Sequence, residues 1–243
     1  MNKSYLRYVH EEAFGLIASS KAPVVTDGAV AYCPAVHEVL AYDLRRGELA
    51  RFMTPDGEGY LLGEVTSLLL VNNDGGGGEE SNDALLAVGY ANGMVRCFRA
   101  SEGGPPLVAL MGHKGVVTCL ASGDGGMLLA SGGNDTDLVL WDLVAERGLA
   151  RLRGHRDAIT AVRFVPTAPT HWSERSGHGA AGGGAAGLGG GSGGRNGGIS
   201  GSGSGGGGGG DRAAPKLLAS ASKDGLVKVW DLSTQHCVQT IVG

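Results

Sequence analysis

Residues 112–143 read GHKGVVTCLASGDGGMLLASGGNDTDLVLWDL. Apolar residues recur in the segments 116–120, 128–131 and 138–141, and glycine, asparagine or aspartate separates one segment from the next. Short alternating segments between such turn residues are typical of β-strands. A further segment of the same kind, 149–152, follows the Trp-Asp pair. The stretch therefore predicts four short strands in about 40 residues, each joined to the next by a tight turn.

The pattern repeats along the chain. Gly154-His155 follows Gly112-His113 after 42 residues, and Trp230-Asp231 matches Trp141-Asp142 at the end of the third segment. The spacing between the two Trp-Asp pairs exceeds the period by the length of a Gly-rich tract. Two earlier, degenerate units keep the phase and close at Tyr42-Asp43 and at Phe98-Arg99. Four units, each with four antiparallel strands, predict β-propeller blades.

On these Gly-His and Trp-Asp pairs the chain resembles the WD-repeat family, over nearly its whole length outside the first 20 residues and two inserts. Units three and four match the family pattern strongly, and units one and two match it weakly. The resemblance implies an all-β WD-repeat β-propeller with about four blades present, an incomplete ring, and a disordered Gly-rich insertion.

Composition predicts the domain boundaries. Of the 46 glycines in the 243 residues, 21 lie in residues 168–213, a tract with almost nothing to bury. We expect an N-terminal segment at 1–23, then blades one to three and the start of blade four at 24–167, with a low-complexity insert at about 71–83. The Gly-rich insertion at 168–213 follows, and 214–243 complete blade four.

Charge and cysteine content exclude several classes of protein. The formal net charge is −4, so no global basic field attracts nucleic acid or an anionic membrane. The four cysteines are far apart and include no Cys-x-x-Cys pair, which argues against a disulfide scaffold or a zinc knuckle. No apolar run of 18 residues and no signal-peptide pattern occurs, so we expect a soluble protein that is not secreted.

The family resemblance implies a hydrogen-bonded network inside each well-formed blade. It joins the His of the Gly-His turn to a serine on the second strand, an aspartate in the next turn and the tryptophan. The residues at these positions are His113, Ser131, Asp135 and Trp141 in unit three, and His155, Ser220, Asp224 and Trp230 in unit four. Unit two has Asn92 and Phe98 at two of the places and unit one lacks the acid, so their blades are expected to be less firmly held.

Other chemical interpretations of these residues are less favoured. His, Ser and Asp also make a hydrolase triad, but the set occurs twice at the same phase and has no Gly-x-Ser-x-Gly elbow. His113 and His155 lack the converging ligands of a metal site. The glycine runs 75–78 and 205–210 have no Gly-Lys-Ser/Thr ending, so they are interpreted as linkers rather than phosphate loops. We therefore predict no catalytic residue, no cofactor and no metal.

Several strings resemble one WD-repeat subfamily, the Dip2-type subunit of the UTP-B subcomplex, and occur in the same order. They are SYLRYV at 4–9, FGLI at 14–17, LAVGY at 86–90, DTDLVLWD at 135–142 and DLSTQHC at 231–237. This resemblance implies a nuclear, nucleolar scaffold of the small-subunit processome in pre-ribosomal RNA processing. Its partners would be other UTP-B WD-repeat subunits, the box C/D snoRNA particle and pre-ribosomal RNA, with no membrane and no small-molecule substrate.

Members of that subfamily have two tandem propellers and a helical C-terminal domain, so we expect this chain to be the N-terminal part of a longer protein. Lys114, Arg156 and Lys223 lie near turns and are candidates for phosphate contact, although solvated turn charges are the commoner case. One alternative is a substrate receptor of a cullin-type ubiquitin ligase, supported only by Arg45, two residues after Asp43. A signalling adaptor is the other, but 1–21 lacks coiled-coil heptads.

Overall fold

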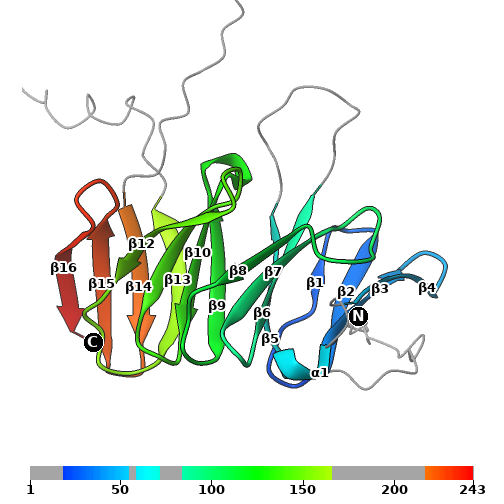
Figure 1. Ribbon diagram of the computed structural model, residues 1–243, viewed down its shortest axis with the longest axis horizontal. Helices are drawn as coiled ribbons and strands as arrows, with labels where there is room; N and C mark the ends of the chain where they lie inside the picture. Colours follow the sequence, from blue (N-terminus) through cyan, green and yellow to red (C-terminus); the bar gives the residue numbers. More distant parts are fainter. Residues whose placement is uncertain (1–18, 55–58, 72–83, 166–216, 243) are drawn as a thin grey trace, which may run out of the picture. The chain divides into compact units, whose positions relative to one another are not determined.

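The computed structural model describes residues 19–54, 59–71, 84–165 and 217–242, and these form four antiparallel sheets of four strands each (Figure 1). We call the sheets blades 1 to 4 in chain order. Blade 1 contains β1 (Val25–Thr26), β2 (Val30–Ala35), β3 (Glu38–Asp43) and β4 (Glu48–Met53). Blade 2 contains β5 (Val65–Val71), β6 (Leu85–Tyr90), β7 (Met94–Arg99) and β8 (Val108–Met111).

Blade 3 contains β9 (Val117–Gly123), β10 (Leu128–Gly133), β11 (Leu138–Asp142) and β12 (Arg147–Leu152). Blade 4 contains β13 (Ile159–Val165), β14 (Leu217–Ser222), β15 (Leu226–Asp231) and β16 (His236–Val242). The only helical elements in the described ranges are α1 (Gly59–Leu62) and the 3-10 turn η1 (Asp124–Gly126), and no helix there is long and apolar enough to cross a membrane.

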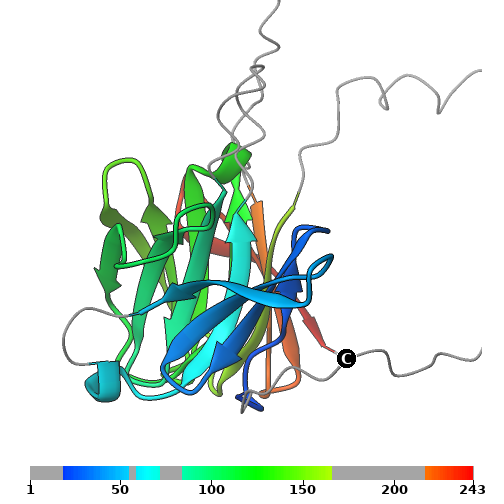
Figure 2. The ribbon, with the colours of Figure 1, turned by 90° about the vertical axis from the view of Figure 1, so that its right-hand side faces the viewer.

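The all-β propeller class is confirmed. Within every blade the spatial order of the strands follows the chain order, and each sheet has the twist usual for β-structure (Figure 2). The predicted strand segments in units three and four fall on β9 to β16. The 71–83 insert and the Gly-rich tract 168–213 lie outside the described residues, apart from Val71, which ends β5.

The first strands of successive blades lie next to one another, because β5 contacts β9 and β9 contacts β13. Each pair of neighbouring blades encloses one apolar cluster, and no cluster lies within a single sheet. The cluster between blades 3 and 4 contains Leu138 and Leu152 from blade 3 and Ile159, Leu218 and Trp230 from blade 4. The hydrophobic core is therefore divided among the blade interfaces.

The acid of the Trp-Asp pair shapes the turn between the third and fourth strands. One carboxylate oxygen of Asp142 accepts the backbone N–H groups of Val144 and Ala145 at 3.0 and 2.9 Å. Asp43 and Asp231 hold the same turn in blades 1 and 4. Four residues after the position of this acid, the backbone of all four blades enters the left-handed region, at Gly47, Gly103, Glu146 and Gln235.

A threonine on the first strand links blade 2 to blade 3 and blade 3 to blade 4. Thr118 Oγ1 lies 2.5 Å from the carbonyl oxygen of Ile159 in blade 4 and 3.0 Å from that of Gly132 in its own blade. Thr66 makes the equivalent pair of contacts, to Val117 of blade 3 and Gly89 of blade 2. Within the part of the chain that the structure describes, Thr160 reaches only Ala221, in its own blade.

We predict that Thr118→Val lowers the free energy of unfolding by about 1–2 kcal/mol, because valine keeps the shape and loses the hydroxyl donor at the junction of blades 3 and 4. Thr160→Val is the matched control and should cost less than half as much, since its hydroxyl reaches one exposed carbonyl. Urea denaturation measures both. Equal losses would contradict a linking role for the threonine.

Candidate functional site

The family-pattern residues of blade 3 come together in one chain of hydrogen bonds. The Nδ1 atom of His113 lies 2.9 Å from Oδ1 of Asp135, and its Nε2 atom lies 2.8 Å from Oγ of Ser131. The indole N–H of Trp141 donates to the same Oγ at 2.8 Å. The four side chains come from the turn before β9, from β10, from the β10–β11 turn and from β11.

Blade 4 repeats the arrangement. His155 lies 2.9 Å from Asp224 and 2.8 Å from Ser220, and Trp230 donates its indole N–H to Ser220 at 2.8 Å. The rings of His155 and Trp230 also meet edge to face, with their centroids 6.2 Å apart. The structure thus brings together all eight residues named from the sequence, four in each of two blades.

The carboxylates are held ionised. Burial by itself raises the pKa of Asp224, but the backbone N–H of Arg156, the ring of His155 and the backbone N–H of Leu226 donate to it and lower its pKa to about 2. Burial likewise raises the pKa of Asp135, but the backbone N–H of Lys114 and the ring of His113 donate to this carboxylate. These hydrogen bonds outweigh burial, so the pKa of Asp135 is lowered. A carboxylate that only accepts requires Nδ1 of each histidine to carry its proton, so Nε2 accepts the serine O–H.

This tautomer is the one a serine hydrolase uses, but substrate access is missing. The His113 side chain has no exposed surface, Ser131 is fully buried, and the Trp141 N–H already occupies a lone pair of the serine oxygen. The same is nearly true of Ser220 in blade 4. The arrangement satisfies buried polar groups and leaves no reactive atom exposed, which is what a structural network requires.

The glycines next to the network lie so close to its side chains that a β-carbon would collide with them. A β-carbon on Gly112 would lie 2.5 Å from the Trp141 ring, and one on Gly154 would lie 3.2 Å from the Trp230 ring. A β-carbon on Gly133 would lie 2.2 Å from a carboxylate oxygen of Asp135. The Gly of the Gly-His pair is thus the residue that lets the turn pack against the indole.

Blades 1 and 2 use different residues, which the sequence did not identify. Cys33 takes the register position of Ser131, and the adjacent Tyr32 donates its hydroxyl to Asp27 at 3.3 Å, while burial raises the pKa of Tyr32 to about 12. In blade 2 the fully buried Tyr90 occupies the position of Gly133, and its hydroxyl has no hydrogen-bond partner among the described residues. Asn92 accepts the backbone N–H of Met94 within its turn and donates its side-chain amide to the carbonyl of Leu61 at 3.3 Å. The lesser firmness expected for these blades stays a prediction.

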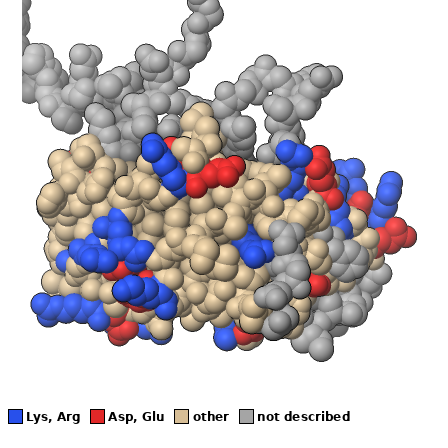
Figure 3. Space-filling view, in the orientation of Figure 1, with Lys and Arg blue, Asp and Glu red and all other residues tan. Residues whose placement is uncertain are grey.

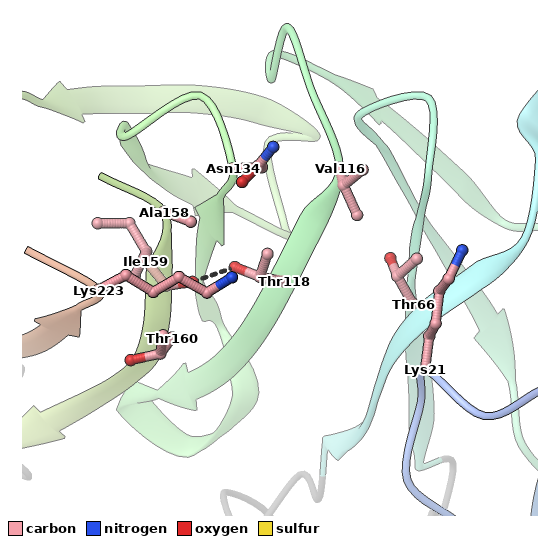
Figure 4. A pocket seen from close by; sticks show the side chains of 9 residues that line it. All are labelled: Lys21, Thr66, Val116, Thr118, Asn134, Ala158, Ile159, Thr160 and Lys223. Atoms are coloured by element: carbon pink, nitrogen blue, oxygen red, sulfur yellow. Dashed lines mark hydrogen bonds between the residues drawn. The ribbon is translucent and has the colours of Figure 1, made fainter. Parts of the chain in front are cut away.

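A cavity of about 340 Å³ lies between the first strands (Figure 4). Thr118 points into it beside the Lys223 chain, while Thr66 and Lys21 lie on its other side. Lys21 is paired with Glu64 at 2.6 Å. The lining consists of Lys21, Thr66, Val116, Thr118, Asn134, Ala158, Ile159, Thr160 and Lys223. It includes no acid, histidine or cysteine that could act as a nucleophile or base.

The charged turn residues named from the sequence lie at the surface. Lys114, Arg156 and Lys223 have exposed side chains, while their backbone N–H groups bond to Asp135, to Asp224 and to the carbonyl of Ala158. All four cysteines are free. Within the described ranges no group of three His, Cys, Asp or Glu side chains is placed to hold a metal ion.

Comparisons with known proteins agree with this fold. The family model "WD domain, G-beta repeat" matches residues 104–142 and 213–231. The nuclear distribution protein PAC1 of Arthroderma otae is 31% identical over 120 residues, which are 49% of this chain and 18% of the relative. The nuclear distribution protein PAC1 of Gibberella zeae is 32% identical over 135 residues, which are 54% of this chain and 21% of the relative.

Human WD repeat- and FYVE domain-containing protein 4 is 40% identical over 62 residues, 26% of this chain and 2% of the relative. The chain thus spans less than a third of the length of these relatives. A crystal structure of the computationally designed Ika8 protein covers 90% of this chain and 47% of its own, at 20% identity and a TM-score of 0.55. The matched family is a repeat whose members generally serve as non-catalytic scaffolds, and no enzyme family is indicated.

We predict that Ser131→Ala lowers the free energy of unfolding by about 1–3 kcal/mol, because it leaves the buried Nε2 atom of His113 and the N–H of Trp141 without their partner. Ser220→Ala should do the same in blade 4. Ser233→Ala, in an exposed turn, is the control and should change stability by less than about 0.5 kcal/mol. Chemical denaturation of the three variants tests this, and neutral effects at Ser131 and Ser220 would contradict it.

The lowered pKa of Asp224 predicts an acid dependence. Its folded pKa of about 2 lies below the ordinary aspartate value of 3.8, so the carboxylate contributes stability that is present in full above about pH 4 and is lost towards pH 2. Asp224→Asn should therefore be less stable than the parent at pH 7 and should approach it near pH 2. Urea titrations across this range measure the difference, with the exposed Glu146→Gln as control. A difference that does not change with pH would refute the assignment.

Proposed function

Because the chain has the all-β fold of an incomplete WD-repeat β-propeller, we propose that it is a non-catalytic scaffold of the small-subunit processome, within the UTP-B subcomplex. In this role it holds neighbouring WD-repeat subunits, the box C/D snoRNA particle and pre-ribosomal RNA in position during processing, in the nucleolus. No residue of this chain acts on a substrate.

The observation that supports the proposal is the ordered set of strings that resemble those of the Dip2-type subfamily. Two of these strings contain residues that the repeat fold does not itself require. The string at 86–90 ends in Tyr90. Its buried side chain occupies in blade 2 the place that the hydrogen-bonded network occupies in blade 3. The string at 231–237 places Gln235 in the left-handed turn position where blades 1 and 2 have glycine. The strings at 4–9 and 14–17 lie outside the described residues.

The surface suits contacts made by several small patches. Lysines and arginines are interspersed with acids on the face seen in Figure 3, and no single sign of charge covers it. Arg151 and Arg153, for example, both lie beside Asp137. Such a surface favours protein partners over a continuous nucleic-acid track, and RNA contact is then local, with the exposed side chains of Lys114, Arg156 and Lys223 as candidates.

A second function is favoured by one specific observation. Several of the relatives are nuclear distribution proteins PAC1, at 31–32% identity over about half of this chain. A scaffold in nuclear distribution is therefore the second candidate. The two candidates differ in their partners and share the non-catalytic mode of action.

We predict that the tagged endogenous protein, purified from nuclear extract, recovers UTP-B subunits together with box C/D snoRNA and pre-ribosomal RNA. RNA recovery should fall as salt is raised, whereas the protein partners should remain, because phosphate contacts are screened and blade contacts are apolar. Mass spectrometry and RNA sequencing across the salt series read both.

The controls separate the alternatives. Recovery of nuclear distribution partners without snoRNA would replace the proposal by the second candidate. Recovery of cullin adaptors, lost in Arg45→Asp and kept in Lys114→Asp, would replace it by the ubiquitin ligase receptor. Both substitutions alter exposed turn residues and leave the blade networks intact.

A further inference from the structure

Two polar side chains of blade 2 are buried without a hydrogen-bond partner. The hydroxyl of Tyr90 and the Nε and Nη1 atoms of Arg96 are fully buried, and none of them meets a partner among the described residues. Tyr90 as a whole is 0% exposed. In folded proteins nearly all buried polar atoms are paired with another group of the protein or with ordered water. These three atoms therefore need a partner that the described part of the chain does not supply.

The two side chains lie on one face of the blade. Val88 is opposite Arg96 where β6 pairs with β7, and Tyr90 follows Val88 by two residues, so all three point to the same side. That side faces blade 1, because Tyr90 lies in one apolar cluster with Val39 and Met53. Burial raises the pKa of Tyr90, and the charge of Arg96 nearby opposes this increase. The unpaired groups thus lie close together in the interface between blades 1 and 2.

Other partly buried arginines of the described chain have partners. Arg51, which reaches the same interface from blade 1, donates Nη1 to the carbonyl of Ala100 at 3.2 Å. Arg151 donates to Asp137 at 2.7 Å. N–H groups that are out of water and unpaired cost free energy, most of all on a charged group. The unpaired guanidinium of Arg96 is therefore not a requirement of the blade fold.

The guanidinium can be reached from the outer rim of blade 2. Its third nitrogen, Nη2, is not one of the fully buried atoms, and Arg96 as a residue is only half-buried. Ala109, which is opposite Arg96 where β7 pairs with β8, is exposed. Nη1 and Nη2 form one fork of the guanidinium, and such a fork matches the two oxygens of a carboxylate or a phosphate. Because two nitrogens are already out of water, little further dehydration of Arg96 opposes the binding of an oxyanion.

The surroundings favour a carboxylate over a phosphate. The pKa of Tyr90 is raised by burial and, to a smaller extent, by the charge of Glu38, so this acid lies nearby and opposes a dianion more than a monoanion. The next arginine on β7, Arg99, is paired with Glu102 at 3.0 Å. Nucleic-acid backbones are bound by several cations together. A lone guanidinium near an acid instead suits one acidic side chain.

We propose that Arg96 and Tyr90 form a binding site for one carboxylate, presented by an aspartate or glutamate side chain of a partner protein. The guanidinium binds the two carboxylate oxygens through Nη1 and Nη2, and the hydroxyl of Tyr90 is the second donor. Arginines that pair in such a dehydrated setting are typical anchors of protein interfaces. The site follows from blade 2 alone and holds in whichever assembly the protein works.

The test titrates the isotopically labelled full chain with a blocked tripeptide that has glutamate between two alanines, and NMR follows the Nε–H resonances of the arginines. The matched control peptide has glutamine in place of glutamate. We expect the glutamate peptide to shift the Arg96 resonance along a saturable curve and the glutamine peptide to bind about tenfold more weakly or less. The Arg99 resonance should stay in place. Tyr90→Phe should weaken binding of the glutamate peptide about tenfold, because it removes a donor to a charged group.

A second measurement separates a binding role from a structural one. Arg96→Met keeps the aliphatic stem and removes the unpaired charge, so it should abolish binding and raise the thermal midpoint by about 2–4 °C. Arg51→Met is the matched control in the same interface and should lower the midpoint, because it breaks the bond to Ala100. Loss of the Nε–H signal in Arg96→Met also assigns the resonance.

Four outcomes would overturn the proposal. They are the absence of a saturable shift with the glutamate peptide, unchanged binding in Tyr90→Phe, a lowered midpoint in Arg96→Met, and inorganic phosphate that binds about tenfold more tightly than the peptide, which would assign the site to phosphate groups. So would a peptide-free Glu38→Gln variant whose Arg96 resonance moves as far as the peptide moves it, because the guanidinium would then be paired within the chain.

Discussion

The fold depends on the burial of one blade's sheet face beneath the next. A four-stranded sheet has two faces and no interior, so its apolar side chains are dry only when another layer covers them. In this chain each apolar cluster draws residues from two neighbouring blades, and none is contained in a single sheet. Adjacent blades therefore stabilise each other, and the polar networks operate in an environment that this packing creates.

The polar networks depend on that packing for their strength. The indole of Trp230 is part of the apolar cluster between blades 3 and 4, and its N–H points to Ser220. Removal from water makes each hydrogen bond in the chain from Asp224 to Trp230 worth more, and makes an unpaired member costly. The catalytic potential of the His-Ser-Asp set is lost for the same reason, since the serine that would attack a substrate is sealed by the tryptophan that it binds.

Sequence alone predicted blades 3 and 4 in detail, because strand alternation and network residues there follow one period. The networks of the first two blades could not be predicted. Tyr32 finds Asp27, a residue outside the repeat pattern, and Tyr90 fills by volume a place that hydrogen bonds fill elsewhere. The repeated position of the threonine could be identified from the sequence, since Thr118 and Thr160 both stand five residues after the network histidine. The acceptor of Thr118 on the next blade becomes apparent only when two blades are packed together.

The same reasoning explains why similarity to WD-repeat proteins of different names says little about the role of this one. The residues most easily shared are those that the blade requires: the glycine beside the indole, the network serine and aspartate, and the acid of the third turn. They are buried or occupied by the backbone, so no partner touches them. Residues that distinguish one scaffold from another must lie on turns, on uncovered faces or where the repeat leaves a polar group unpaired. In this chain Arg96 departs from the shared pattern, because two nitrogens of its guanidinium are buried with no partner among the described residues, and selection of a partner by charge begins at such a group.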